Sequence, residues 1–434
     1  MEEKVFSSWE NTSNENEELL EDAIRNPGKP IITLDQLTNK IEYKPKQGHG
    51  KYRPSIHIGQ RKLFINELQF LNKHITPGNY NNFVIYAGGS PGHHMYELSR
   101  YYPDVKFIII DPSRHQSYIT DILEMKGINK CDYQRVIYYD TNNKYIKKLD
   151  NLDQLNEFFD DGVRILILQQ LCTSELLLDI KSRLPSNSNI YLWSDIRTND
   201  AESGKYGYDK GGKRYNMTVL GKERVTDGDI TWNLVLQYNW LKSLEPDVCM
   251  FKFRLPFYKN DIDNIKTYME NNKQDFDQSP ELDIINNYNN KTMLYPKGKI
   301  YIQPWQGVKS TESRLVIKKS NIYNLIKYDS HEYDDRFNYY NLIERVIRKH
   351  NNGTRYYKYG YCECNDCAIE LDTFKEYVSR DANKNHIIKE FNINKLAKHK
   401  IIGTLCTRLG CIFGTKLEGV NEHGINRYPL SSKH

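Results

Sequence analysis

The sequence lacks any long hydrophobic run, and no apolar segment approaches the roughly 20 residues that a membrane span requires. The first 21 residues are acidic and polar, so they have neither the basic start nor the apolar stretch of a secretory signal peptide. Cysteine is also scarce, with 8 residues in a chain of 434, and a disulfide scaffold is not expected. These absences favour reduced thiols in a cytosol-like compartment.

A strong charge of one sign is missing as well. The 61 Lys and Arg residues nearly balance the 56 Asp and Glu residues, which leaves a net charge of +5. Any affinity for nucleic acid would therefore come from a local basic patch. Mean hydropathy is low, at −0.73, but the 12% of aromatic residues indicates a folded protein. The length allows two or three domains, or one elaborated α/β domain.

No internal repeat is visible, and between about residues 55 and 330 apolar runs alternate with helical patterns. The apolar runs are continuous, as expected for strands that are buried on both faces. Strands are expected at Phe83–Tyr86, Val105–Ile110, Val163–Leu168, Ile190–Trp193 and Val248–Phe253, and helices at Arg61–Lys73 and about Met95–Tyr102. This alternation predicts an α/β fold with a mostly parallel sheet between layers of helices.

A glycine-rich turn, Tyr86–Gly92, lies between an expected strand and an expected helix. Glycine lets the backbone approach a ligand closely, and ligands of open α/β sheets bind beyond the carboxyl ends of the strands. Asp111 ends the next strand, where an acid can bind both hydroxyls of a ribose. The spacing fits neither G-x-G-x-x-G nor a phosphate loop. The pattern favours an adenosine-bearing cofactor such as S-adenosylmethionine, and the alternative is a structural turn with a helix-capping Asp.

Two lysines and two acids occur in the order Lys–Asp–Lys–Glu, each in a recognisable local setting. Lys62 heads an apolar periodic segment, whereas Asp195 and Lys252 each end an apolar run. Glu312 precedes the run Ser313–Ile317. The order resembles the signature of RNA ribose 2′-O-methyltransferases. The alternative is two surface lysines and two strand-end acids.

These residue types suit methylation of a ribose hydroxyl, which is a poor nucleophile and must lose its proton as the methyl group arrives. A lysine takes that proton only if its pKa falls from about 10.4 toward neutrality, which burial and a second cation promote. We expect Lys252 to be the base and Lys62 to supply the second charge. Asp195 and Glu312 would orient the two ammonium groups, and no metal ion is required.

The chain resembles the poxvirus cap-specific mRNA 2′-O-methyltransferase family, whose members also serve as poly(A) polymerase regulatory subunits. The matching blocks are Glu42–Pro45, Gly59–Leu63, Tyr86–His94, Ile110–Asp111, Ser194–Arg197, Lys252–Phe257, Gln303–Pro304, Thr311–Leu315 and Tyr333–Asp334. The resemblance implies a Rossmann-like S-adenosylmethionine-dependent methyltransferase domain over residues 41–345. It also implies capped mRNA as substrate, a poly(A) polymerase catalytic subunit as partner, a large DNA virus as source, and the host cytoplasm or the virion as location.

The regions outside that domain, and two stretches within it, have a different composition. Residues 1–40 are interpreted as a weakly ordered lead-in, and residues 346–434 as a C-terminal extension of unknown role. The stretches 198–229, rich in Gly, Asp and Lys, and 260–297, rich in Asn and Asp, are interpreted as surface insertions.

The resemblance also implies roles for individual residues. Cofactor binding is expected of Gln60, Tyr86, Gly88, Gly92, His94, Asp111, Arg114, Tyr139 and Asp195. Arg197, Arg254 and Arg314 stand beside the expected catalytic residues and could bind RNA phosphates, or could be ordinary strand-end charges.

Recognition of the cap would use aromatic rings, because N7-methylguanine is cationic and stacks strongly between them. In the family an aromatic in the block of Tyr43 and one at Phe257 make this sandwich, and a carboxylate matched by Asp334 takes the guanine edge. Lys259 stands where the family has an acid, and Asp261 could substitute for it. Taken singly, Tyr43 and Phe257 could instead be packing aromatics.

The C-terminal extension contains a C-x-C-x-x-C pattern in a turn-like stretch. It consists of Cys362, Cys364 and Cys367, which Cys406, Cys411, His386 or His399 could complete as a tetrahedral zinc site. The usual two-plus-two spacing is absent, so unligated thiols are the alternative.

Three functions are compatible with the sequence. The first is a cap-specific 2′-O-methyltransferase, and the second is a catalytically silent subunit that holds RNA for a poly(A) polymerase. The third is a ribosomal-RNA-type 2′-O-methyltransferase, which would not need the aromatic pair. The intact set Lys62, Asp195, Lys252 and Glu312 argues against a purely silent subunit.

Overall fold

The protein is described by a computed structural model that covers two compact units. Unit 1 comprises Met1–Lys73, Tyr301–Glu312 and Glu332–His434, and unit 2 comprises His74–Ile300 and Ser313–His331. The structure describes residues 30–43, 56–90, 92, 94–112, 135–139, 145–148, 152–160, 164–168, 170–196, 227–256, 292–306, 310–345 and 365–380. Residues of the range 41–345 contribute to both units.

The strands form a mostly parallel sheet, which confirms the expected α/β class. The strand order is β4-β3-β5-β2-β1-β6-β7-β10-β9. Their bounds are β1 (Asn82–Ala87), β2 (Val105–Ile110), β3 (Arg135–Tyr139), β4 (Tyr145–Lys148), β5 (Ile165–Leu168), β6 (Asn189–Ser194), β7 (Val248–Phe253), β9 (Lys299–Ile302) and β10 (Ser313–Lys318). Strands β5, β2, β1, β6 and β7 run parallel, whereas β3 and β10 join them antiparallel.

The apolar sequence of the central strands explains their position. Every residue of β1 and β5 is buried, and in β2 only Lys106 is less than fully buried. The register aligns the carboxyl ends of three neighbouring strands, since Ala87 of β1 pairs with Ile110 of β2 and with Ser194 of β6. The residues that follow these three strands therefore meet at one edge of the sheet.

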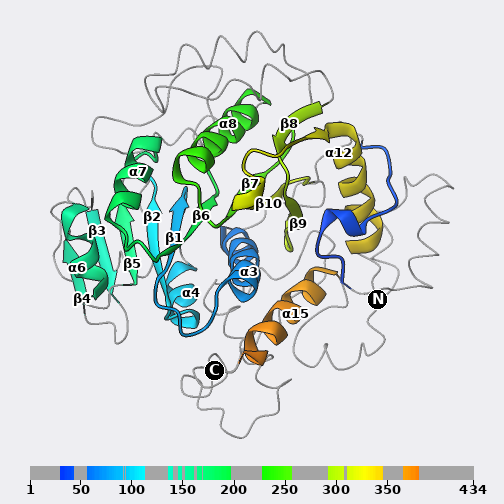
Figure 1. The fold of residues 1–434 in the computed structure, drawn as a ribbon. Helices are drawn as coiled ribbons and strands as arrows, with labels where there is room; N and C mark the ends of the chain where they lie inside the picture. Colours follow the sequence, from blue (N-terminus) through cyan, green and yellow to red (C-terminus); the bar gives the residue numbers. More distant parts are fainter. Residues whose placement is uncertain are drawn as a thin grey trace, which may run out of the picture. The chain divides into compact units, whose positions relative to one another are not determined.

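Helices cover both faces of this sheet. Unit 2 contains α4 (Met95–Tyr101), α6 (Leu155–Asp160), α7 (Ser174–Arg183) and α8 (Asp227–Leu244), with the short turns η3 (Leu152–Gln154) and η5 (Lys319–Asn321). Helices α7 and α8 lie on one side of the central strands and α4 on the other (Figure 1). A separate two-stranded sheet pairs β8 (Thr292–Pro296) with β11 (Leu325–Asp329).

The described part of unit 1 is mainly helical. It contains η1 (Leu34–Gln36), α3 (Ile56–His74, whose last residue belongs to unit 2), the greater part of α12 (Ser330–Tyr339), the π-helical turn η6 (Tyr340–Glu344) and α15 (Asn365–Ser379). Phe64, Ile65 and Leu68 on α3 are fully buried. The ring of Phe374 on α15 lies 6.5 Å from that of Phe64. Helix α15 is thus part of the core of unit 1.

Three boundaries differ from the sequence prediction. Residues 30–40 belong to the expected lead-in, yet Ile31, Leu34 and Leu37 are buried because they pack within unit 1. Helix α8 begins at Asp227 and β8 occupies Thr292–Pro296, so the ends of the ranges 198–229 and 260–297 belong to regular elements. The other residues of the two expected insertions lie outside the described part of the chain, apart from Lys297, and the insertions stay predictions. No helix in the described part of the chain is long and apolar enough to cross a membrane.

Candidate active site

The glycine-rich turn after β1 is held at the aligned edge of the sheet. Gly88 has a φ of +80°, and a Cβ atom there would lie 2.8 Å from the backbone nitrogen of Ile196. Glycine is therefore required, because the turn crosses the chain that leaves β6 at close range. The backbone N–H of Ser90 donates to Asp111 Oδ2 at 3.0 Å. Asp111 thus holds the turn through Ser90; both its expected contact with a cofactor and the alternative of a helix-capping role stay predictions.

Two of the other expected cofactor residues lie in the interior of unit 2. The ring of Tyr86 is buried and meets that of Trp193 edge-on, with the centroids 5.6 Å apart. His94 is buried directly before α4, and its carbonyl accepts from the N–H of Leu98. Gly92 has a φ of +63°, which again suits glycine.

Three further residues that were expected to bind the cofactor have side chains outside the described part of the structure. Gln60 falls in α3 and Tyr139 in β3, but their side chains lie outside the described part of the structure. Arg114 lies outside the described residues altogether. Their roles stay predictions.

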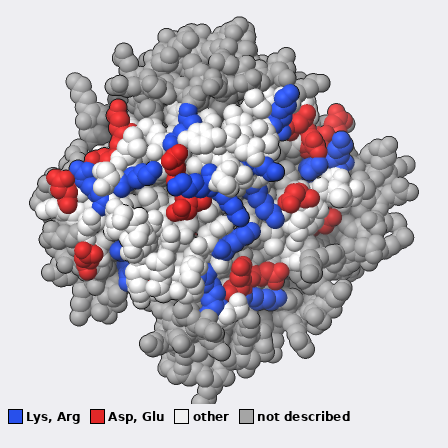
Figure 2. Space-filling view, in the orientation of Figure 1, with Lys and Arg blue, Asp and Glu red and all other residues white. Residues whose placement is uncertain are grey.

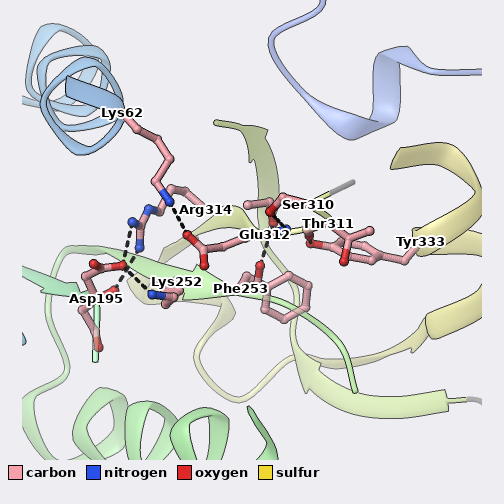
Figure 3. A network of polar contacts seen from close by, with 11 residues as sticks. Lys62, Asp195, Lys252, Phe253, Ser310, Thr311, Glu312, Arg314 and Tyr333 are labelled. Atoms are coloured by element: carbon pink, nitrogen blue, oxygen red, sulfur yellow. Dashed lines mark hydrogen bonds and ion pairs between the residues drawn. The ribbon is translucent and has the colours of Figure 1, made fainter. Parts of the chain in front are cut away.

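The acid after β6 contacts two cations in unit 2. Asp195 Oδ1 is 3.2 Å from Nζ of Lys252 and 2.7 Å from Nη2 of Arg314 (Figure 3). Arg314 also donates to the carbonyl of Ser194 at 3.4 Å. Asp195 and Lys252 are only 17% and 15% exposed, so these charges interact with limited screening by solvent.

The register of the sheet explains this cluster. Strands β6 and β7 are parallel, and Lys252 lies one residue beyond the partner of Ser194. Strand β10 is antiparallel to β7 and places Arg314 directly opposite Lys252. Like charges in opposed positions repel, so the Asp195 carboxylate between the cations offsets an unfavourable pairing.

The second lysine and the second acid form an ion pair within unit 1. Nζ of Lys62 lies 2.6 Å from Oε1 of Glu312, and the side chains are 17% and 10% exposed. The chain before Glu312 is fixed by hydrogen bonds: Tyr333 donates to the carbonyl of Thr311 at 2.7 Å, and the N–H of Glu312 donates to Oγ of Ser310 at 3.2 Å (Figure 3). The four expected catalytic residues are therefore all engaged in lysine–carboxylate pairs rather than exposed singly.

Glu312, which contacts Lys62, and Arg314, which contacts Asp195, are only two positions apart in the sequence. Glu312 ends its segment of unit 1, Ser313 begins the next segment of unit 2, and Arg314 follows. Ser313 is buried and its hydroxyl donates to the carbonyl of Phe253 at 3.1 Å. The antiparallel start of β10 is thus anchored on β7 one residue after Glu312.

The arginines expected at phosphates differ in their surroundings. Arg314 is only 3% exposed and contacts Asp195, so it is not the strand-end surface charge that one interpretation suggested. Arg254 is partly buried directly after β7, and Arg197 lies outside the described residues. The contact of Arg314 with Asp195 was not predicted, because it depends on the antiparallel register of β10.

Lys and Arg side chains are intermixed with acidic ones on the face drawn in Figure 2.

Two of the expected cap-binding residues are linked through α12. Oδ1 of Asp335 accepts the backbone N–H of Tyr43 at 2.8 Å, and its carbonyl accepts that of Ile41 at 3.1 Å. Asn338, one turn further along α12, donates to the carbonyl of Glu42 at 2.8 Å. Asp334, the neighbour of Asp335, is 5% exposed. Sequence reasoning missed Asp335, whose spacing from Tyr43 carries no local signal.

The remaining expectations fall on undescribed positions. Phe257, Lys259 and Asp261 lie outside the described residues. So do Cys362, Cys364, Cys406, Cys411, His386 and His399, while Cys367 falls in α15 with a side chain that is not described. Among the described residues, no group of three or more His, Cys, Asp or Glu could hold a metal ion. The zinc site stays a prediction.

Comparison with known proteins identifies relatives of this chain. The model of the poly A polymerase regulatory subunit family matches residues 26–152. A cap-specific mRNA (nucleoside-2′-O-)-methyltransferase of fowlpox virus (strain NVSL) is 22% identical over 363 residues, which cover 80% of this chain and 88% of that protein. The protein of the same name from myxoma virus (strain Lausanne) is 27% identical over 107 residues, which cover 24% of this chain and 32% of that protein. In sequence, this chain is a distant relative of the poly A polymerase regulatory subunits and of the poxvirus cap-specific mRNA 2′-O-methyltransferases, which confirms the resemblance stated above.

Proposed function

We propose that this protein transfers a methyl group from S-adenosylmethionine to the 2′-OH of the first transcribed nucleotide of m7G-capped RNA. The observation that carries the proposal is the cluster at Asp195, whose Oδ1 is shared by Lys252 and the buried Arg314. The names of the relatives support the same reaction class. The ion pair of Lys62 with Glu312 supports it independently, because it engages the other two residues of the signature.

The residues at the aligned sheet edge fit an adenosine-bearing cofactor. Gly88, Asp111 and Asp195 directly follow the carboxyl ends of β1, β2 and β6, the edge at which open α/β sheets bind their ligands. Asp111 would accept hydrogen bonds from the ribose hydroxyls, since it already lies against the glycine turn through Ser90. The bound cofactor supplies an activated methyl group on a sulfonium.

Lys252 is proposed to remove the proton from the ribose 2′-OH. The bond from O2′ to the methyl carbon forms as the bond from that carbon to sulfur breaks, and the hydroxyl proton passes to Nζ of Lys252. Two charged groups act on this amine: the guanidinium of Arg314 opposes a second positive charge nearby, whereas the carboxylate that both cations share attracts one. Asp195 would hold both cations in place. Lys62, oriented by Glu312, is proposed to supply a second positive charge, as the resemblance implies.

Cap recognition is proposed for Tyr43, Phe257 and Asp334. The backbone of Tyr43 is tethered by Asp335, which limits the freedom of an aromatic ring that must stack on a base. A residue whose backbone is ordered before binding loses less conformational entropy when its ring stacks.

A direct assay tests the proposed function. The protein is incubated with isotopically labelled S-adenosylmethionine and RNA that begins with m7GpppN, GpppN or an uncapped nucleotide, and the labelled nucleoside is identified after digestion. We expect 2′-O-methylation of the first nucleotide with a clear preference for m7GpppN. Equal rates on the three RNAs would contradict the proposed cap specificity and would favour a ribosomal-RNA-type 2′-O-methyltransferase instead.

A second function is favoured by the match to the poly A polymerase regulatory subunit family. We propose that the protein also supports a poly(A) polymerase catalytic subunit by holding RNA. The two functions are compatible. Tail elongation by such a polymerase with and without this chain would test the second one, and unchanged tail lengths would exclude it.

A further inference from the structure

Helix α15 lies in the C-terminal extension and carries two buried carboxylates. Asp366 and Glu370 are four residues apart, so they project from the same face of the helix. Both side chains are fully buried. Buried carboxylates need charged or hydrogen-bonding partners, and the partners of these two lie on other segments of unit 1.

Glu370 is engaged through both of its oxygens. Oε1 accepts from Nη2 and Nε of Arg61 at 2.5 and 3.0 Å, and Oε2 accepts from Nε1 of Trp305 at 3.0 Å. The guanidinium of Arg61 also lies 5.3 Å from the centre of the Trp305 ring, as in a cation–π contact. One carboxylate therefore connects α3 with the segment Tyr301–Glu312.

Asp366 makes a second connection to the same segment. Its Oδ2 accepts from Nε of Arg345 at 2.9 Å, and Oδ1 accepts from the hydroxyl of Tyr340 at 3.2 Å. Arg345 in turn donates to the carbonyl of Gln306. Trp305, between these contacts, has a φ of +65°, which side-chain-bearing residues rarely adopt. Such a conformation persists only where the surroundings hold it in place.

Contacts at the far end of α3 also come from α15 and the residue after it. Asn72 donates to the carbonyl of Thr373 at 2.9 Å. Arg380 donates to the carbonyls of Leu71 and Asn72, which lie in the last turn of α3. Helix α3 is therefore fixed by α15 both at Arg61 and in its last turn.

The position of Lys62 follows from these contacts. Arg61 and Lys62 are consecutive on α3, so their side chains point about 100° apart around the helix axis. Because Arg61 is buried against Glu370, the rotation of α3 about its axis is set one residue before Lys62. The partner of Lys62, Glu312, belongs to the segment that Trp305 and Gln306 attach to α15.

We infer that α15 is a positioning element for the pair Lys62–Glu312, and that Glu370 is a positioning residue that acts through Arg61 and Trp305. This gives the C-terminal extension a role in orienting the residues proposed for methyl transfer. The consequence for catalysis rests on the proposed function, whereas the consequence for the environment of Lys62 does not.

The test is to replace Glu370 and to measure the accessibility of Lys62 directly. The full chain is treated with formaldehyde and cyanoborohydride, and methylation of Lys62 is measured by peptide mass spectrometry relative to the exposed Lys327. In Glu370→Gln we expect Lys62 to react severalfold faster relative to Lys327, because α3 can rotate and release Lys62 from Glu312. We also expect kcat to fall by about 10- to 100-fold with little change in KM for the cofactor, as for a misplaced catalytic group.

The matched control is Asp372→Asn on the same helix. Asp372 forms an exposed pair with Lys375, so its loss should leave both the reactivity of Lys62 and kcat unchanged. A folded Glu370→Gln protein with wild-type reactivity of Lys62 would overturn the inference.

Trp305→Phe decides the question if Glu370→Gln does not fold. This variant keeps an aromatic ring and the Arg61–Glu370 ion pair but removes the hydrogen bond to Oε2 and part of the buried indole. The thermal unfolding midpoint should therefore fall, and in the protein that remains folded Lys62 should become more reactive. Unchanged reactivity in this variant would equally overturn the inference. If the wild-type chain shows no methyl transfer, the proposed function fails, while the labelling still decides the role of α15.

Discussion

At the scale of the residue, one carboxylate oxygen organises the charges at the edge of the sheet in unit 2. Oδ1 of Asp195 meets both Lys252 and Arg314. The two cations are cross-strand partners, and without the carboxylate their repulsion would drive the side chains apart. The arrangement keeps the amine of Lys252 beside the guanidinium of Arg314 at low exposure, with one carboxylate in contact with both.

Replacement of the proposed base gives the first prediction. Lys252→Ala should lower methyl transfer by about three orders of magnitude or more, because general-base catalysis supplies roughly 10²–10⁴ and positioning adds to it. Cofactor affinity and the thermal unfolding midpoint should change little. Single-turnover methyl transfer to m7G-capped RNA measures the loss, with Lys327→Ala, at an exposed lysine, as the control. Retention of more than about a tenth of wild-type turnover would contradict the role of Lys252.

The acid after β2 gives a prediction that separates its two roles. Asp111→Asn keeps an oxygen that can accept the N–H of Ser90 but removes the charge expected at the cofactor ribose. We expect S-adenosylmethionine to bind about 1.5–3 kcal/mol more weakly, with the unfolding midpoint nearly unchanged. Calorimetric titration checks this, and an unaltered dissociation constant would limit Asp111 to its structural contact with the turn.

At the scale of the element, the turn after β1 depends on how closely two chain segments cross. At Gly88 a Cβ atom would meet the backbone of Asp195 and Ile196 at 2.8–2.9 Å. Backbone atoms held in adjacent parallel strands cannot move aside without disturbing the sheet. The absence of a side chain at Gly88 therefore lets the chain after β1 pass close to the chain after β6, whether or not a ligand is bound.

Two glycines with the same backbone conformation allow this crowding to be measured. Gly78 has a φ of +81° and Gly88 of +80°, but a Cβ atom at Gly78 would have nothing within 4 Å. Gly78→Ala should cost roughly 1–2 kcal/mol of stability, which is the cost of the left-handed conformation alone. Gly88→Ala should cost clearly more. Chemical denaturation of both variants provides the comparison, and equal losses would show that the crossing is not tight.

At the scale of the whole molecule, substrate choice is proposed to depend on a segment near the N-terminus held by a helix far along the chain. Asp335 and Asn338 of α12 fix the backbone of residues 41–43 almost 300 positions away. If Tyr43 stacks on the methylated base, this tether contributes to affinity by reducing the entropy lost on stacking.

The corresponding prediction uses the ring and its tether. Tyr43→Ala should raise KM for m7G-capped RNA by a factor that corresponds to about 1–3 kcal/mol, the usual scale of base–aromatic stacking. Asp335→Asn should raise it less, because the amide oxygen can still accept from Tyr43. Neither change should affect cofactor affinity. Steady-state kinetics on m7GpppN and GpppN RNA measures both, and an unchanged preference in Tyr43→Ala would remove Tyr43 from the cap site.

The sequence by itself determined the central strands and the residues that end them. Continuous apolar runs predicted β1, β2, β5, β6 and β7 because strands buried on both faces have no polar side. The same strands fix where the acids Asp111 and Asp195 fall, since each follows its run directly. Parallel strands bring their carboxyl ends together, so the grouping of these acids at one edge was accessible from local pattern alone.

Only the tertiary structure decided which charges meet. The contact of Arg314 with Asp195 depends on the antiparallel register of β10 on β7, and the pair Arg61–Glu370 joins residues 309 positions apart. Local periodicity reports whether a residue is buried, but it does not specify its partner. The partner of a buried charge is chosen by the packing of distant segments, where the desolvated group must find its counterion.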